Sequence, residues 1–232
     1  MNFSFSQILL VITTMLLLGS CANTRAPVRQ EVVSRGIGIP EPASILFVGN
    51  SYSFEVPKQL RKIAARNGRD LRIDQVTHGG WSLARHVQNE ETLRKIREGG
   101  WDVVVIQEQS RIPSLPHKRE RAMFPNVRKL AGEARAHGAA PVLYQTWGRR
   151  DGDEWLLVKD DFHAMTRRLR EGYHEAARDA GGLAIVPVGD VWEREVNAGN
   201  GGSLFLADGS HPTARGDLLT AQTFFDALFP SL

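Results

Sequence analysis

The sequence predicts an α/β fold in which a five-stranded parallel sheet lies between two layers of helices. Short apolar runs alternate with longer amphipathic segments through residues 43–232, and this alternation is typical of strand–helix–strand units in a three-layer sandwich. The content of 42% hydrophobic and 24% charged residues is ordinary for a globular protein. The chain of 232 residues is long enough to form one domain with a sizeable core.

Five segments have the length and apolar character of buried strands. They are Ile45–Val48, Leu71–Val76, Val103–Ile106, Pro141–Tyr144 and Leu183–Val188. The second segment alternates apolar and polar residues, whereas the third is almost entirely β-branched, as expected of a strand buried on both faces.

Six segments between and after these strands are predicted to be helices. They are Val56–Asn67, Leu83–Arg97, Arg119–His137, Phe162–Asp179, Val191–Val196 and Thr213–Leu228. Gly68 and Gly181-Gly182 follow the first and fourth helices at positions typical of C-caps. Pro125 is expected to kink or split the third helix because proline cannot donate its backbone hydrogen bond. A flexible loop is expected at Gly199–Gly202.

The N-terminus is predicted to be a signal peptide at residues 1–20, followed by a tether at residues 21–42 and the folded domain at residues 43–232. Ile8–Leu18 is apolar but shorter than the ~20 residues of a membrane span. Leu18-Gly19-Ser20-Cys21 resembles a bacterial lipobox, which implies cleavage before Cys21 and lipidation of its thiol. Cys21 is the only cysteine and has no disulfide partner in the chain.

One feature of the N-terminus counts against lipidation and another suggests a destination. Met1–Gln7 lacks Lys and Arg, so an uncleaved signal anchor remains the alternative. Ala22 follows the predicted lipidated cysteine in place of an aspartate. The resemblance then implies a lipoprotein of the bacterial cell envelope, anchored in the outer membrane if the host has one.

Charge and composition argue against several classes of partner. The chain carries a net charge of +3 and has no block of Lys and Arg interleaved with aromatic residues, so nucleic acid is not an expected partner. His, Cys and carboxylate residues do not cluster at metal-ligand spacings. We therefore expect no metal and no cofactor, and the oligomeric state is left open.

Polar residues follow the predicted strands where each strand ends. Ser51 follows the first strand, Gly79 and Gly80 follow the second, and Gln107 follows the third. Thr146-Trp147-Gly148 follows the fourth strand. Because the carboxyl ends of parallel strands share one edge of a sheet, these segments are expected to line a single cleft.

Asp208-Gly209-Ser210-His211-Pro212 near the C-terminus supplies the residues that such a cleft needs for nucleophilic catalysis. An Asp three residues before a His can bind its Nδ1 and leave Nε2 free as a base. The predicted catalytic set is therefore Ser51 as nucleophile, His211 as base and Asp208 as its orienting partner. Predicted oxyanion donors are the backbone N–H groups of Ser51, Gly79 or Gly80 and the side-chain amide of Gln107.

These motifs resemble the SGNH/GDSL hydrolase superfamily. Its Gly-Asp-Ser block corresponds to Gly49-Asn50-Ser51, its second-block glycine to Gly79-Gly80, and its Asp-x-x-His-Pro block to residues 208–212. The resemblance covers about residues 44–228 and implies a flavodoxin-like sandwich with metal-free esterase or acylhydrolase chemistry. Asn50 departs from the family pattern, and no Gly-x-Asn run follows the third strand, so Gln107 or Gln109 is expected to replace that Asn, with Gln107 preferred.

Each motif also has a structural interpretation. Gly-Asn-Ser is common in turns, and an N-cap on the last helix is the alternative role for Asp208. Ser53 is a competing hydroxyl, although it is expected to start a helix. Four aromatic or His residues are candidates either for substrate contact or for packing and surface positions: His78, His86, Trp81 and Trp147.

The expected function is a lipid-anchored, extracytoplasmic serine esterase that removes small acyl groups, acetyl foremost, from a carbohydrate or related envelope substrate. An acyltransferase with the same catalytic set is an alternative, because an acceptor hydroxyl can replace water. A glycan-binding lipoprotein without turnover is another, favoured by the missing Gly-x-Asn run. A flavodoxin-like nucleotide binder is a remote fourth, suggested only by the hydroxyl-rich Asn50–Ser53 loop.

Overall fold

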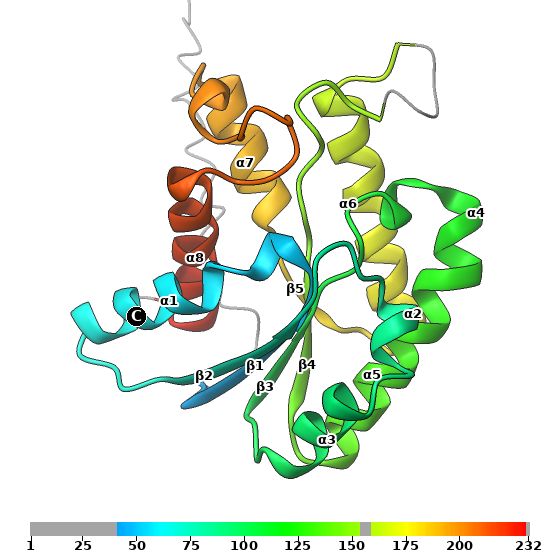
Figure 1. Cartoon of the computed structure of the whole chain (residues 1–232), viewed down its shortest axis with the longest axis vertical. Helices are drawn as coiled ribbons and strands as arrows, with labels where there is room; N and C mark the ends of the chain where they lie inside the picture. Colours follow the sequence, from blue (N-terminus) through cyan, green and yellow to red (C-terminus); the bar gives the residue numbers. More distant parts are fainter. Residues whose placement is uncertain (1–40, 154–158, 231–232) are drawn as a thin grey trace, which may run out of the picture. The chain divides into compact units, whose positions relative to one another are not determined.

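A computed structural model describes residues 41–153 and 159–230 of the chain. The predicted signal peptide, Cys21 and nearly all of the predicted tether lie outside the described residues. The described residues form a five-stranded, wholly parallel sheet in the order β2-β1-β3-β4-β5 (Figure 1). Its strands are β1 (Ser44–Gly49), β2 (Arg72–Thr77), β3 (Val103–Ile106), β4 (Ala140–Tyr144) and β5 (Ala184–Val186). The predicted fold class is confirmed.

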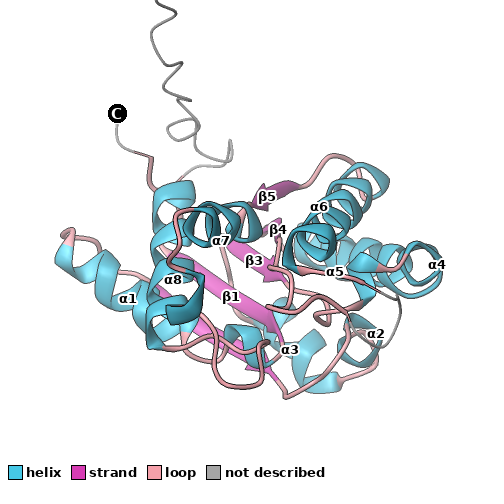
Figure 2. Cartoon of the chain, turned by 90° about the horizontal axis from the view of Figure 1, so that it is seen from above, coloured by secondary structure: helices cyan, strands magenta, loops and turns pink. Residues whose placement is uncertain are grey.

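Helices cover both faces of the sheet (Figure 2). They are α1 (Val56–Arg66), α2 (Leu83–His86), α3 (Glu90–Glu98), α4 (Pro116–Lys118), α5 (Phe124–Ala136), α6 (Phe162–Asp179), α7 (Val188–Asn197) and α8 (Ala214–Leu228). In the described part of the chain, no helix combines the length and apolar character that crossing a membrane requires.

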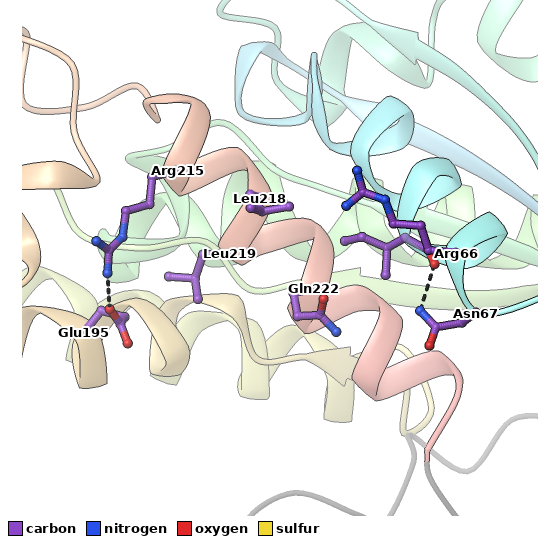
Figure 3. Close-up of a pocket in the computed structure, with 8 residues that line it drawn as sticks. Arg66, Asn67, Glu195, Arg215, Leu218, Leu219 and Gln222 are labelled. Carbon is purple, nitrogen blue, oxygen red and sulfur yellow. Dashed lines mark hydrogen bonds and ion pairs between the residues drawn. The ribbon is translucent and has the colours of Figure 1, made fainter.

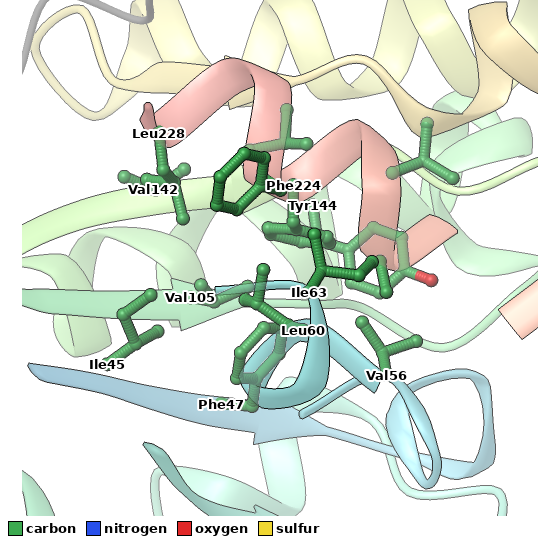
Figure 4. Close-up of a cluster of buried hydrophobic side chains, with 14 of the residues drawn as sticks. Ile45, Phe47, Val56, Leu60, Ile63, Val105, Val142, Tyr144, Phe224 and Leu228 are labelled. Carbon is green, nitrogen blue, oxygen red and sulfur yellow. The ribbon is translucent and has the colours of Figure 1, made fainter. Parts of the chain in front are cut away.

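The alternation of side chains along the strands divides the core into two clusters. Ile45 and Phe47 of β1 belong to one cluster with apolar residues of α1, α7 and α8, and Figure 4 shows its part around α1 and α8. Leu46 and Val48, which point to the opposite face, pack against α2, α3, α5 and α6. All four side chains are fully buried, so β1 is a central strand with no solvated face.

The strand order places a topological switch point between β1 and β3. The chain leaves β1 toward β2 on one side and leaves β3 toward β4 on the other. The two connections therefore diverge at the carboxyl ends of these strands, which is where open α/β sheets bind ligands. Ser51 lies two residues beyond the end of β1, and Gln107 directly follows β3.

The main differences from the predicted boundaries lie in three parts of the chain. The helix predicted at 83–97 is split into α2 and α3, because the Asn89 side chain accepts a hydrogen bond from Thr92 N–H (2.7 Å) and starts a new helix. The helix predicted at 119–137 begins with a π-helical segment, Arg119–Met123, ahead of Pro125 in the first turn of α5. Strand β5 stops at Val186, because Pro187 ends it and α7 begins directly afterwards.

Glu108, the residue after Gln107, is a carboxylate buried within the fold. Its Oε1 accepts hydrogen bonds from the N–H groups of Leu83 (3.0 Å) and Gln109 (2.7 Å). Its Oε2 is buried with no partner among the described residues. Burial raises the pKa of Glu108 to about 7, although the two backbone hydrogen bonds act in the opposite direction. Glu108 therefore fixes the start of α2 beside the end of β3.

The raised pKa of Glu108 predicts how stability depends on pH. The pKa of this carboxyl group is higher in the folded state than in the unfolded state. The free energy of unfolding therefore falls as the pH rises from the ordinary pKa of a glutamate, 4.5, to about 7. Glu108→Gln keeps an oxygen that can accept both N–H groups and removes the buried charge. We expect urea unfolding to show the variant more stable than wild type at pH 8, by on the order of 3 kcal/mol.

The same comparison at pH 4 should give nearly equal free energies of unfolding, because Glu108 is then protonated in the fold. Glu120→Gln, which neutralises an exposed carboxylate, is the matched control and should show no such pH-dependent gain. A Glu108→Gln variant less stable than wild type at both pH values would contradict this account of the buried charge.

Candidate active site

The turn after β1 presents Ser51 at the carboxyl edge of the sheet. Asn50 has an extended backbone and starts a short 3₁₀ helix, Ser51–Ser53. The Asn50 Oδ1 accepts a hydrogen bond from Tyr52 N–H (3.1 Å), and its Nδ2 donates to the carbonyl of Trp81 (3.0 Å). An aspartate at this position has no hydrogen to donate to that carbonyl. The Asn50 side chain therefore joins the nucleophile turn, residues 50–53, to the loop after β2.

Gln107 holds the same turn from the neighbouring strand. Its Oε1 accepts from Asn50 N–H (2.8 Å) and from the Ser53 hydroxyl (3.1 Å). Its Nε2 donates to Asn50 Oδ1 (3.0 Å) and to the Glu108 carbonyl (2.5 Å). Both Nε2 hydrogens are thus engaged, and the side chain is 1% exposed. The predicted oxyanion role of Gln107 is therefore corrected: it is a positioning residue.

Gly49 is required by the close approach of Gln107. A Cβ atom at residue 49 would lie 2.4 Å from Gln107 Oε1, so no larger residue fits without moving the amide. The Gly49 carbonyl accepts hydrogen bonds from His86 Nε2 (2.8 Å) and from His78 N–H (3.2 Å). These two hydrogen bonds to the Gly49 carbonyl hold the end of β1.

His86, for which packing was one of the interpretations of the sequence, is a buried supporting residue. Because a carbonyl only accepts, its contact with Gly49 requires a proton on Nε2, while Nδ1 faces the Thr92 hydroxyl (3.0 Å). Burial lowers the pKa of His86 to about 4, so the ring is neutral at physiological pH. Its spacing of three residues from buried Leu83 on α2 was the available signal for an inward position.

The loop that carries Asp208 and His211 is closed by backbone hydrogen bonds. Phe205 and Pro212 form an antiparallel bridge, and Leu206 N–H donates to the His211 carbonyl (2.9 Å). Thr213, not Asp208, caps α8, since its hydroxyl accepts from Gly216 N–H (3.2 Å). The helix-capping interpretation of Asp208 is therefore wrong.

The Asp208 carboxylate binds both the backbone N–H and the imidazole ring of His211. Its Oδ2 accepts from His211 Nδ1 (2.6 Å), while its Oδ1 accepts from the N–H groups of Ser210 (2.9 Å) and His211 (3.0 Å). Gly209 has a φ of +65°, which lets the chain turn back between them. Partial burial acts to raise the pKa of Asp208, but these hydrogen bonds lower it to about 2, so the carboxylate is ionised.

The structure brings the three predicted catalytic side chains together. Ser51 Oγ lies 2.9 Å from His211 Nε2, although 160 residues separate them. With Asp208 bound to Nδ1, the proton of a neutral His211 belongs on Nδ1, and Nε2 is free to accept the hydroxyl proton. His211 retains 41% exposure of its side chain, so the contact is accessible from solvent.

Tyr52 and Trp147 fix the last loop relative to the nucleophile turn. The Tyr52 hydroxyl lies 2.6 Å from Ser210 Oγ, and Trp147 Nε1 donates to the Ser210 carbonyl (3.1 Å). The rings of Tyr52 and Trp147 stack at 4.5 Å, and Trp147 stacks on Trp192 at 3.8 Å. Trp147 is fully buried. It is therefore a packing residue and not a sugar platform.

Gly79 and Gly80 lie in an exposed loop tied to the nucleophile turn. His78 N–H binds the Gly49 carbonyl and the Trp81 carbonyl binds Asn50, so both ends of the loop are held. Within the described residues, the N–H groups of Ser51, Gly79 and Gly80 donate to no other protein atom. These groups are consequently available as donors to a bound oxyanion.

The remaining candidates divide between the interior and the cleft. Ser53 is fully buried, with its hydroxyl bound to Gln107, so it is not accessible as a nucleophile. The His78 and Trp81 rings stack at 3.9 Å and are both partly exposed. Gln109 donates to the Ser110 hydroxyl and accepts from Arg111 N–H, contacts within its own loop.

A separate groove lies between α1 and α8 (Figure 3). It has a volume of about 460 Å³, and its lining includes Leu218, Leu219 and an Arg215–Glu195 ion pair of 3.1 Å. None of the residues around Ser51 lines it. In residues 41–153 and 159–230, no three His, Cys, Asp or Glu side chains are placed to hold a metal ion.

Among known proteins, only solved structures match this chain. No family model and no curated protein matches the chain. A candidate SGNH hydrolase from Slackia heliotrinireducens is 28% identical, with a TM-score of 0.66, over 80% of this chain and 98% of its own. A DUF4886 family protein from Bacteroides uniformis is 20% identical, with a TM-score of 0.66, over 80% and 82% of the two chains.

The fold also occurs in an acetylxylan esterase from Geobacillus stearothermophilus, at 15% identity and a TM-score of 0.60, over 83% of this chain and 97% of that one. At this identity the likeness concerns the fold. The parallel sheet and the match to the Slackia protein agree with the resemblance of the sequence motifs to the SGNH/GDSL superfamily. The motifs, the sheet and the matched structures together support the SGNH/GDSL superfamily and a serine ester hydrolase.

Proposed function

We propose that this protein is a serine esterase that uses Ser51, His211 and Asp208 to remove small acyl groups, acetyl foremost, from a carbohydrate or related envelope substrate. The observation that carries the proposal is the continuous contact from Ser51 Oγ through the His211 ring to Asp208, at 2.9 and 2.6 Å. The carbohydrate class is supported by the partly exposed Trp81–His78 stack beside Gly79 and Gly80.

The reaction follows from these contacts. Ser51 Oγ attacks the ester carbonyl while His211 Nε2 accepts its proton, and Asp208 stabilises the imidazolium that forms. The carbonyl oxygen becomes an oxyanion and accepts hydrogen bonds from the N–H groups of Ser51 and of Gly79 or Gly80. His211 then gives its proton to the departing alcohol, and water attacks the acyl-Ser51 ester by the reverse sequence.

The proposed location is the extracytoplasmic side of the bacterial envelope, with the enzyme anchored by lipid on Cys21. The support is the lipobox-like run Leu18–Cys21 and the absence of any other cysteine. An anchored esterase would act on substrates held at the envelope, which agrees with a polymeric carbohydrate.

Ser51→Ala should abolish turnover. The alanine removes the atom that attacks, so we expect kcat/KM for 4-nitrophenyl acetate to fall by about 10³-fold or more. A fluorophosphonate probe should label wild type, with the adduct mapped to Ser51 by mass spectrometry. Ser53→Ala is the matched control and should keep the label at Ser51. Absence of labelling in wild type would instead support a glycan-binding protein without turnover.

Asp208→Asn should reduce activity with little change in structure. The asparagine is isosteric but uncharged, so it no longer stabilises the His211 imidazolium or fixes its tautomer. We expect kcat/KM to fall about 10²- to 10⁴-fold. Asp151→Asn, which neutralises an exposed carboxylate beside Arg150, should retain wild-type activity. Activity of Asp208→Asn within threefold of wild type would remove Asp208 from the proposed catalytic set.

Cys21→Ser should release the protein from membranes. Without the thiol there is no site for the lipid, so we expect the variant in the soluble fraction of expressing cells and wild type in the membrane fraction. Mass spectrometry of wild type should show a diacylglycerol-modified N-terminal Cys21. An unmodified, uncleaved N-terminus in the membrane fraction would instead support a signal anchor.

A further inference from the structure

Arg149 lies beside the loop that carries Asp208 and His211, but it takes no part in the contacts described above. Two residues before it, Trp147 Nε1 donates to the Ser210 carbonyl (3.1 Å). One residue after it, Arg150 N–H donates to the Gly209 carbonyl (2.7 Å). Arg149 therefore lies between two residues that contact that loop directly, Trp147 and Arg150.

The guanidinium of Arg149 has no partner among the described residues, in contrast to nearby arginines. Arg111 binds Asp153 (2.8 Å), Arg150 binds Asp151 (3.2 Å) and Arg168 binds Asp160 (2.6 Å). The Arg149 Nε atom is buried and makes no hydrogen bond. A buried N–H group without an acceptor is unfavourable, so an acceptor that reaches the guanidinium would relieve this cost.

The charge of Arg149 acts on Tyr52, the residue that follows Ser51. Burial raises the pKa of Tyr52, and the Ser210 hydroxyl and the positive charge of Arg149 oppose that rise. Tyr52 directly follows Ser51, and its hydroxyl binds Ser210, which directly precedes His211. Arg149 therefore lies near the Tyr52–Ser210 contact, which joins the turn of Ser51 to the loop of His211.

We propose that Arg149 is a specificity-determining residue that binds a carboxylate of the substrate, so that the natural substrate is an acylated acidic sugar. This inference rests on the proposed esterase function and names the substrate class for the same site. The planar guanidinium matches a carboxylate with two parallel N–H···O hydrogen bonds. The partly exposed His78–Trp81 stack provides an apolar surface for the sugar ring.

The experiment compares two acetylated sugars that differ only in a carboxylate: acetylated methyl glucuronide and acetylated methyl glucoside. Acetate release should show wild type preferring the glucuronide, with a kcat/KM about tenfold higher, mainly through a lower KM. Arg149→Gln should reduce this ratio to about one, and Arg149→Lys should restore part of it. Arg94→Gln, which removes an exposed charge on α3, should retain the wild-type ratio. An unchanged ratio in Arg149→Gln would overturn the proposal.

Binding to the Ser51→Ala variant separates this inference from the proposed catalysis. Calorimetry with unacetylated methyl glucuronide and methyl glucoside needs no turnover. Tighter binding of the glucuronide that is lost on adding Arg149→Gln supports the role of Arg149, even if wild type releases no acetate. Equal binding of the two sugars, or binding unaffected by Arg149→Gln, contradicts it. Failure of acetate release with both sugars would count against the esterase function.

Discussion

The position of Ser51 depends on a pair of side-chain amides, Asn50 and Gln107, that bind each other and the backbone around them. Gln107 accepts from Asn50 N–H and donates to Asn50 Oδ1. Asn50 in turn binds Tyr52 N–H on one side and the Trp81 carbonyl on the other. Because the pair is buried, each hydrogen bond is made in a medium that strengthens it and penalises its loss. The turn, the strand β3 and the loop of Gly79 and Gly80 therefore hold one arrangement.

A second set of contacts joins this turn to the loop at the far end of the chain. The Tyr52 hydroxyl and Trp147 Nε1 both bind Ser210, and the stack of Tyr52, Trp147 and Trp192 places these groups in the core. The reacting groups at the surface are thus positioned by rigid aromatic packing beneath them. His211 and Asp208 remain partly exposed to solvent.

Much of the fold was predictable because its signals are local. Apolar runs marked all five strands, and Pro125 marked the irregular start of α5. The contact between Ser51 and His211, which are far apart in sequence, was also predictable, because loops at the carboxyl ends of parallel strands share one edge of the sheet. The role of Gln107 could not be predicted in this way, because it depends on which neighbours its amide meets across the sheet. The contacts of His86, and the absence of a partner for the Arg149 guanidinium among the described residues, likewise depend on three-dimensional neighbours that no short motif encodes.

The central claim is that the amide pair positions the nucleophile and leaves backbone N–H groups to bind the oxyanion. A crystal structure of the protein with a phosphonate bound covalently to Ser51 tests it most directly, since the phosphonyl oxygen occupies the place of the oxyanion. The account predicts this oxygen within about 3 Å of the N–H groups of Ser51 and of Gly79 or Gly80, with Gln107 Nε2 still bound to Asn50. A Gln107 amide turned toward the phosphonyl oxygen would contradict it.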